Sequence, residues 1–403
     1  MENNQKKIET KMVRTQTERS PHREHASSIY MTSSYVFEDA EHARAMFARE
    51  VPGSIYTRYS NPNVDEFVEK MCHLEGAEAG VAVASGMSAV FNSIAGLLNT
   101  GDHVLACRSV FGSTHQILTE ILPRWQMSHT YVGISSSPAE WEAAVQPNTK
   151  LCIVESPTNP ALDIIDLQWL GAFCREHEII LVVDNVFATP ILQTPLRMGA
   201  NLVMHSATKF IDGQGRAIGG ILVGDAELIK KIAFFTRHTG PSLSPFNAWL
   251  FSKGLETLSL RVERHCDNAE KVAAFLIDHK QVTTVKYPHH LSHPQYEIAR
   301  QQMCRGGALV SFEIQGGVEQ GRRFLDSMEF ISLTANLGDS RTIATHPAST
   351  THSSLTEEAR QEVQITPGLI RISVGLEHAD DIIRDLDQAL RESASEKRAA
   401  VAG

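Results

Sequence analysis

The sequence lacks several features that would assign a protein to a large class at once. No stretch approaches the roughly 20 apolar residues of a membrane-spanning helix, and the polar residues 1–27 contain no apolar core of a secretory signal. Basic residues are outnumbered, with 37 Lys and Arg against 47 Asp and Glu. This balance argues against nucleic acid or a membrane surface as partner. We therefore expect a cytoplasmic protein that acts on small molecules.

Cysteine and histidine are also sparse in the patterns that bind metals. The six cysteines include no C-x-x-C pair, and Cys107, Cys152 and Cys174 lie in or beside apolar runs, as buried free thiols do. His346 and His352 stand close in sequence without acidic or thiol partners at ligand spacing. The sequence thus predicts no metal site.

The sequence does contain enough hydrophobic residues for a large core, because 42% of its 403 residues are hydrophobic. From residue 78 onward, short apolar runs such as "AGVAVAS", "DHVLAC", "KLCIVES", "IILVVDN" and "ANLVMHS" alternate with amphipathic segments. This alternation predicts an α/β fold with a mostly parallel sheet covered by helices on both faces.

The end of the chain has a different pattern. A helix-like stretch starting at "SPFNAWLFSKGLE" leads to strand candidates "GALVSFEI", "FISLTA" and "LIRISVG" and a closing helix. We predict an N-terminal arm at residues 1–60, a large domain at 61–254 and a smaller α+β domain at 255–403. The polar arm, with its aromatic patches, is expected to pack on something else.

Four loops follow predicted strands at the edge where such a sheet binds ligands. In "ASGMSAV", the backbone N–H groups of Gly86 and Met87 at a helix start would hold a phosphate, although for this motif alone a capped helix with a tight turn is the favoured interpretation. In "ESPTNP", the prolines would aim Asn159 into the cleft or simply form a turn.

The other two loops carry charged groups. Asp184 ends the apolar strand "LVVD", where a carboxylate is costly to bury without a cation or strong donor. In "SATK", Ser206 and Thr208 flank Lys209, which would form an imine with an aldehyde, whereas an isolated lysine is usually a solvated turn residue. A phosphate cradle, a carboxylate and an imine-forming lysine together are what pyridoxal 5'-phosphate (PLP) requires.

The motifs "YTRYSNPN", "ASGMSA", "ESPTNP", "VVDN", "SATKF" and "IRISVGLE" closely resemble, in the same order, those of the Cys/Met-metabolism family of PLP enzymes. The resemblance runs from about residue 54 to 378. It implies PLP-dependent transferase fold type I, with a mostly parallel seven-stranded sheet in a PLP-binding domain at residues 61–254. It also implies that the arm contacts a neighbouring subunit, and that active sites lie at the interface of a dimer, paired again into a homotetramer.

The resemblance assigns roles to individual residues. Lys209 is implied as the lysine that binds the PLP aldehyde, Asp184 as the partner of the pyridine nitrogen, and Arg371 as the ligand of the substrate α-carboxylate, assisted by Asn159 and Ser340. The cofactor phosphate would be held by a group of small and hydroxylated residues together with two side chains from the neighbouring subunit: Gly86, Met87, Ser206 and Thr208, with Tyr56 and Arg58.

One position departs from the family pattern. Relatives commonly carry tyrosine in a "YGGT"-like segment that stacks on the cofactor ring, but here the segment reads "SVFGST" with Phe111. A phenyl ring still stacks, whereas it cannot transfer protons. We therefore expect Lys209 and Tyr56 to carry the protons.

The segments "GQGRAIGG" and "NLGDSRTIATHPASTTHS" most resemble the branch of the family that makes homocysteine for methionine biosynthesis, by replacing the succinyl ester of O-succinyl-L-homoserine with sulfide. Arg216 or Arg49 would meet the succinyl carboxylate. The alternatives are enzymes that use the acetyl ester, that use cysteine as sulfur donor, or that eliminate instead of replacing. A non-catalytic regulatory protein of the same fold is the alternative from a different class. A nucleotide-binding module lacks support, because no G-x-G-x-x-G follows a strand.

Overall fold

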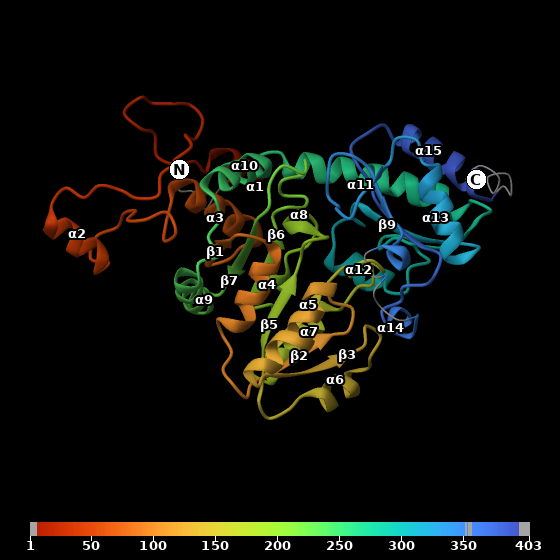
Figure 1. The fold of residues 1–403 in the computed structure, drawn as a ribbon, viewed down its shortest axis with the longest axis horizontal. Coiled ribbons are helices and arrows are strands. Elements are labelled where there is room, and N and C mark those ends of the chain that lie inside the picture. The colour runs from red at the N-terminus through yellow and green to blue at the C-terminus, as the bar shows by residue number, and fades with distance from the viewer. Residues whose placement is uncertain (1–5, 351–352, 354–356, 395–403) are drawn as a thin grey trace, which may run out of the picture.

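The computed structural model describes residues 6–350, 353 and 357–394. Its larger sheet has seven strands in the order β1-β7-β6-β5-β4-β2-β3 (Figure 1). Their bounds are β1 (Ala79–Val83), β2 (His103–Cys107), β3 (Ser128–Val132), β4 (Thr149–Glu155), β5 (Ile180–Asp184), β6 (Leu202–Ser206) and β7 (Gly220–Gly224). Strand β7 pairs antiparallel with both of its neighbours, and the other pairings are parallel. The predicted mostly parallel seven-stranded sheet is confirmed.

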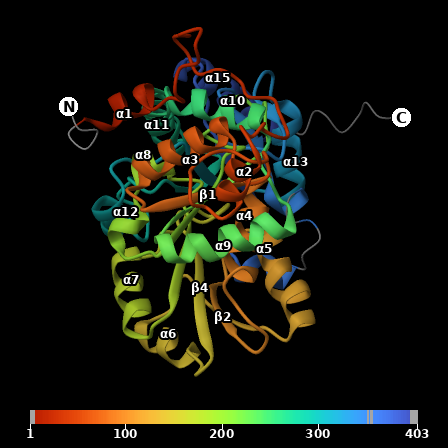
Figure 2. The same cartoon turned by 90° about the vertical axis from the view of Figure 1, so that its left-hand side faces the viewer.

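Helices cover both faces of this sheet, as predicted. Figure 2 shows β2 and β4 between α7 on one side and α4 with α5 on the other. One face packs against α3 (Pro62–Glu75), α7 (Leu167–Glu176) and α10 (Pro245–Leu255). The opposite face packs against α4 (Gly86–Ala95), the segment after α5 (Gly112–Gln116), and α9 (Ala226–Thr239). Buried residues at helical spacing explain the packing: α3 places Phe67, Met71 and Leu74 in the core.

A second, five-stranded sheet has the order β10-β11-β12-β9-β8. Its strands are β8 (Val282–Lys286), β9 (Leu309–Ile314), β10 (Ser332–Leu333), β11 (Ile343–Thr345) and β12 (Leu369–Ser373).

 Strand β12 lies at the centre of this sheet, between β11 and β9. The sheet packs against α13 (Gly317–Ser327) and α15 (Ala379–Ala394). This confirms the smaller α+β region, although the strand predicted at "FISLTA" is only the two residues of β10.

The sequence predicts one long helix from "SPFNAWLFSKGLE" onward. This prediction is wrong in one respect, because the structure has two helices there. Helix α10 ends at Leu255 and α11 spans Leu258–Ile277. The first half of α11 packs on the larger sheet through Val262, and its second half packs on the smaller sheet through Val272. Helix α11 therefore joins the two cores (Figure 1), and the boundary at residue 255 stays a prediction.

The N-terminal segment carries α1 (Ile8–Arg14), which packs on the core through Met12, and α2 (Ala40–Phe47). Helix α2 projects away from the rest of the chain (Figure 1). Apolar side chains are exposed along this segment, with Val36 at 98%, Met31 at 68% and Phe47 at 60%. That these side chains contact a neighbouring subunit stays a prediction.

The remaining helices connect these layers: α6 (Pro138–Ala144), α8 (Thr189–Leu192), α12 (Tyr296–Gln302) and α14 (Glu357–Glu362). No helix among the described residues is long and apolar enough to cross a membrane. Cys107, Cys152 and Cys174 are buried free thiols, as predicted.

Candidate active site

The four loops singled out from the sequence meet at one edge of the larger sheet. Strands β4, β5 and β6 are parallel neighbours, and β1 runs in the same direction because β7 is antiparallel to both β1 and β6. The carboxyl ends of all four strands therefore lie at the same edge. Ser85, Asn159, Asp184 and Lys209 follow these ends.

The first loop packs directly on the last one. Ser85 caps α4, with its Oγ accepting the N–H of Ser88 at 3.1 Å. A Cβ on Gly86 would lie 2.7 Å from the Cβ of Ser206, so a larger residue would push the two loops apart. The first N–H groups of α4, including those of Gly86 and Met87, have no partner within the helix and suit an anion.

The hydroxyl groups beside Lys209 lie at the same place. Ser206 is the last residue of β6, opposite Gly86. The Thr208 hydroxyl accepts the N–H of Gly219 at 3.2 Å, which fixes the side chain next to β7. Gly86, Ser206 and Thr208 therefore lie close together, and that they hold a phosphate stays a prediction.

Lys209 lies in a tight turn and its side chain is held from the smaller domain. Its N–H donates to the carbonyl of Ser206 at 3.2 Å, and its Nζ donates to Asn336 Oδ1 at 2.6 Å. Burial, and after it the positive charge of Arg371, lowers the pKa of the Lys209 amine to about 8. The amine is therefore available as a nucleophile and base near neutral pH.

Asp184 and Glu155 form a pair of neighbouring carboxyl groups. They are matched residues at the ends of the parallel strands β5 and β4. Burial raises the pKa of Asp184 to about 6, while the Val186 N–H, which donates to Oδ1 at 3.0 Å, acts in the opposite direction. Burial and the nearby Asp184 raise the pKa of Glu155 well above its usual range. A cationic ring nitrogen would favour the ionised form of Asp184.

Arg371 extends from β12 toward this edge and is 3% exposed. Its Nη1 donates to Asn159 Oδ1 at 2.7 Å, and its Nη2 donates to the carbonyl of Asn336 at 3.2 Å. Among the described residues no group pairs with its buried Nε, and burial lowers the pKa of the Arg371 guanidinium to about 10. A buried guanidinium with a spare donor suits a carboxylate ligand.

The contacts of Ser340 differ from those of the other predicted residues. Its N–H donates to the carbonyl of Gly213 at 2.8 Å, and its Oγ donates to Asp339 at 3.4 Å. The side chain that contacts Lys209 in this loop is Asn336, which the sequence analysis missed. The signal was present, because Asn336 lies within the motif "NLGDSRT" that had been noted without assigning a role to its asparagine. The role of Ser340 stays a prediction.

Phe111 immediately precedes α5, and its side chain is 41% exposed. Its backbone N–H approaches the carboxyl group of Glu155, as does that of Asn159, and both lower the pKa of that group. Phe111 therefore lies beside the same strand ends as Asp184, where a planar ligand would meet its ring.

Tyr56 and Arg58 contact a different part of the chain. The Arg58 guanidinium lies 4.8 Å from the centre of the Tyr59 ring and donates to the carbonyl of Arg237 in α9. Tyr56 is 40% exposed. Within one chain Arg58 is therefore held against α9, and the contribution of either residue to a neighbouring subunit's site stays a prediction.

The arginines considered for a succinyl carboxylate are placed differently. The Arg216 Nε donates to the buried Asp212 at 3.0 Å, and the Arg216 side chain is 35% exposed. Arg49 lines a cavity of about 940 Å³ between the N-terminal segment and α9, together with Arg58 and Arg237. Neither the ion pair of Arg216 nor the cavity beside Arg49 identifies a binding site for the acyl group of the substrate.

Of the two histidines noted in the sequence, the structure shows the surroundings of one. His346 is buried, with Nδ1 at 2.7 Å from Ser349 Oγ and Nε2 at 2.8 Å from the carbonyl of Pro367. His352 lies outside the described residues. Among the residues that the structure describes, no group of three or more His, Cys, Asp or Glu side chains could hold a metal ion.

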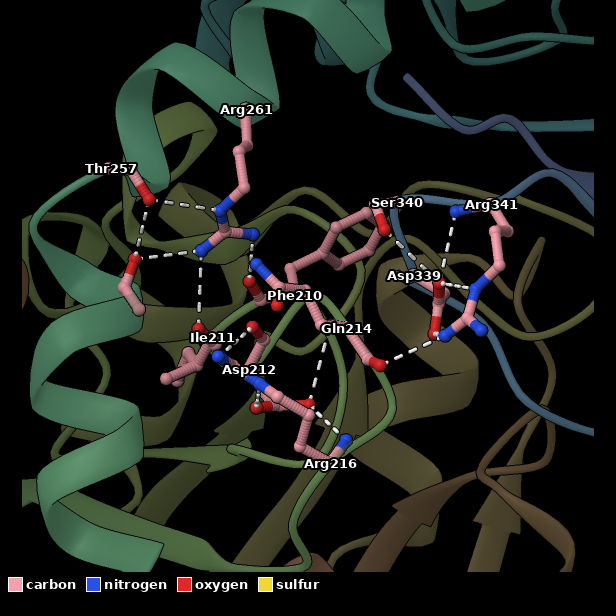
Figure 3. A network of polar contacts seen from close by, with 11 residues as sticks. Phe210, Ile211, Asp212, Gln214, Arg216, Thr257, Arg261, Asp339, Ser340 and Arg341 are labelled. Atoms are coloured by element: carbon pink, nitrogen blue, oxygen red, sulfur yellow. Dashed lines mark hydrogen bonds and ion pairs between the residues drawn. The ribbon is translucent and has the colours of Figure 1, made fainter. Parts of the chain in front are cut away.

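Polar contacts continue beyond Lys209 into the next residues of the loop (Figure 3). Arg261 of α11 donates to the carbonyls of Phe210 and Ile211 at 2.6 and 3.2 Å. Arg341 donates to the carbonyl of Gln214 at 2.9 Å. The loop that carries Lys209 is thus held by both α11 and the loop before β11.

Comparisons with known proteins agree with this geometry. Residues 9–391 match the family described as Cys/Met metabolism PLP-dependent enzyme. An O-succinylhomoserine sulfhydrylase of Pseudomonas aeruginosa is 47% identical over 95% of both chains. An L-methionine gamma-lyase of Porphyromonas gingivalis is 42% identical over 91% of this chain and 92% of its own.

A solved structure extends the agreement to the whole fold. A Campylobacter jejuni protein described as an O-acetylhomoserine (thiol)-lyase with N'-pyridoxyl-lysine-5'-monophosphate superposes with a TM-score of 0.91 at 33% identity. The match covers 96% of this chain and 100% of that one. The chain belongs to the Cys/Met metabolism family of PLP-dependent enzymes.

Proposed function

We propose that this enzyme is an O-succinylhomoserine sulfhydrylase, which converts O-succinyl-L-homoserine and hydrogen sulfide to L-homocysteine and succinate. The observation that carries the proposal is the buried Arg371, whose partnerless Nε lies in the same polar cluster as Lys209. This arrangement suits an amino acid bound by its α-carboxylate beside a basic amine. The 47% identity to a relative of that name supports the choice of substrate.

The residues at the strand ends fit PLP. Because Gly86 has no side chain, the start of α4 lies close to Ser206. The free N–H groups of Gly86 and Met87, with the hydroxyl groups of Ser206 and Thr208, would hold the phosphate there. Asp184 would hold the ring nitrogen, and Phe111 would stack on the ring. When bound, PLP supplies an electron sink for the carbon atoms next to the amino group.

The protons are moved by the chain's own groups. With a pKa of about 8, the neutral Lys209 amine takes the proton from the α-carbon, releases it to water, and then takes a second proton from the β-carbon, so that the γ-ester leaves as succinate. Sulfide adds at the γ-carbon, and the protons return to the same positions. Asn336 holds the amine between these transfers at 2.6 Å. Tyr56 of the neighbouring subunit is the second proton donor in this scheme.

Binding of the substrate is divided between two groups of residues. Arg371 and Asn159 take the α-carboxylate, with Ser340 supporting their loop. The succinyl carboxylate requires a cation outside this cluster. Arg49 is the stronger of the two candidates, because Arg216 is already paired with Asp212.

A second candidate function is γ-elimination, which the 42% identity to methionine gamma-lyases favours. An acetyl ester as substrate, or cysteine as sulfur donor, would need only a different pocket for the leaving group or nucleophile. A non-catalytic protein of this fold would bind PLP without turnover.

One experiment separates these functions. The purified PLP-loaded enzyme is given the succinyl or the acetyl ester, each with sulfide or with cysteine, and the amino-acid products and any 2-oxo acid are measured. The proposal expects homocysteine from the succinyl ester with sulfide as the fastest reaction. A preference for the acetyl ester, for cystathionine formation, or for 2-oxo acid release would contradict it.

The proposal also includes the oligomeric state of the enzyme and its location in the cell. The enzyme would be a cytoplasmic homotetramer, a dimer of dimers, whose active sites lie at the dimer interface. The exposed apolar side chains of the N-terminal segment support such an interface.

A further inference from the structure

Arg261 is a buried cation that forms no ion pair within the described residues. It lies near the start of α11 and is 8% exposed. Its Nη1 donates to the carbonyl of Phe210 at 2.6 Å, and its Nη2 donates to the carbonyls of Gly254 and Ile211 at 2.8 and 3.2 Å. Its Nε donates to the Thr257 hydroxyl at 3.3 Å. The Asp212 carboxylate acts on Arg261 only through its charge and is paired with Arg216. A buried guanidinium held by neutral oxygen atoms is costly, so this arrangement needs a reason beyond stability.

Two of the three carbonyl groups that Arg261 binds belong to the two residues directly after Lys209 (Figure 3). The same turn is closed by the Gly213 N–H, which donates to the carbonyl of Lys209 at 2.8 Å. Gly213 has a φ of +67°, and a Cβ there would collide with the Arg261 guanidinium. The turn and the guanidinium therefore fit each other closely, and the position of one fixes the other.

The smaller domain is tied to the same turn. The Ser340 N–H donates to the carbonyl of Gly213 at 2.8 Å, and Arg341 donates to that of Gln214 at 2.9 Å. The segment that carries these residues also carries Asn336, which accepts from the Lys209 amine at 2.6 Å. Arg261 thus holds the turn that contacts both the backbone of Lys209 and the loop that carries Asn336.

We propose that Arg261 is a positioning residue for Lys209, acting through the carbonyls of Phe210 and Ile211. The guanidinium can bind several carbonyls at fixed angles, which an ammonium group cannot do. Without it, the turn relaxes and the Lys209 amine leaves its place between Asn336 and Arg371. This inference rests on the proposed role of Lys209.

The test compares Arg261→Met and Arg261→Lys with the control Lys70→Met. Lys70 is a completely buried cation that pairs with Glu66 and Glu256 and does not touch the turn after Lys209. Because small displacements of reacting groups cost about 100-fold in rate, Arg261→Met is expected to lower kcat by about that factor, with little change in KM. Arg261→Lys is expected to fall between it and the parent enzyme. Lys70→Met should lower Tm while kcat changes by less than about threefold.

A second readout needs no turnover. Competitive acylation of the protein freed of PLP, followed by peptide mass spectrometry, gives the pKa of the Lys209 amine. We expect about 8 in the parent protein. In Arg261→Met the value should rise toward the ordinary lysine value of about 10.4, because the amine gains access to water. The control Lys70→Met should keep the parent value.

An unchanged Lys209 pKa in Arg261→Met, or equal losses of kcat in Arg261→Met and Lys70→Met, would show a purely structural role. If Arg261→Met does not fold, Arg261→Lys decides alone, and parent-like kcat and Lys209 pKa in that variant would overturn the proposal. The acylation result does not depend on the ester. Failure of the parent enzyme to use O-succinyl-L-homoserine would therefore contradict the proposed function and leave the Arg261 test standing.

Discussion

At the scale of single residues, a buried arginine and a half-buried lysine share one polar cluster. Arg371 and Lys209 both contact Asn336, one through its backbone carbonyl and the other through its side chain. The positive charge of Arg371 helps to lower the pKa of Lys209. A substrate carboxylate bound to Arg371 would offset that charge, so substrate binding and the basicity of the amine are coupled.

The pH dependence of the reaction follows from two of these groups. Asp184 must be ionised to hold a cationic ring nitrogen, and the ionised fraction grows as pH rises through about 6. Lys209 must be unprotonated to accept a proton, and that fraction grows as pH rises through about 8. Activity should therefore increase in two steps between acidic and mildly alkaline pH. Initial rates measured across this range check it, and a decline between pH 6 and 8 would count against both assignments.

The replacement of the usual tyrosine by Phe111 leads to a prediction about Tyr56. Because proton transfer by a positioned side chain is worth about 100-fold or more, Tyr56→Phe should lower kcat by roughly that factor. Phe111→Tyr, which restores the common residue, should change kcat by less than about threefold. Steady-state kinetics of both variants check this, and an unchanged kcat in Tyr56→Phe would remove Tyr56 from the mechanism.

At the scale of secondary structure, the close packing of α4 on β6 depends on a glycine. In Gly86→Ala the new Cβ would lie 2.7 Å from the Cβ of Ser206, so the two loops must move apart. Overpacking of this kind costs about 1–3 kcal/mol, so we expect PLP to bind about tenfold more weakly or worse. Gly112→Ala is the matched control, because its Cβ would meet no atom within 4 Å. Equal PLP dissociation constants for both variants would argue against the cradle.

The arrangement of strands and helices also explains which features could be predicted from the sequence and which could not. Asp184 and the turn at Lys209 were found because polar residues after parallel strands must gather at one edge. Asn336 was missed because its contact with Lys209 spans 127 residues of sequence, and no local pattern reports such a pairing. The division of the long helix at residues 256–257 was also missed, since both halves share helical apolar spacing.

At the scale of the whole molecule, the contact of Arg58 with α9, outside the cluster around Lys209, leads to a test of shared active sites. Subunits carrying Lys209→Ala and subunits carrying Arg58→Ala are each expected to be nearly inactive. If Arg58 serves the neighbouring subunit, dimers that contain one of each have one intact site. After random exchange, the mixture should regain about a quarter of parent activity.

The control for this exchange is a mixture of two Lys209→Ala preparations, which should stay inactive. Recovery must also depend on exchange, so it should appear only after the subunits are dissociated and reassembled. A mixture that regains nothing, although mixed dimers are detected by mass, would place Arg58 in the site of its own chain or outside any site.

The most direct test of the central claim is to identify the lysine that binds PLP. The loaded enzyme is reduced with borohydride and digested, and the peptides are analysed by mass spectrometry. We predict a pyridoxyl group on Lys209 at about one per chain, and loss of that adduct in Lys209→Ala. An adduct on a different lysine of the parent enzyme, or none at all, would contradict the account.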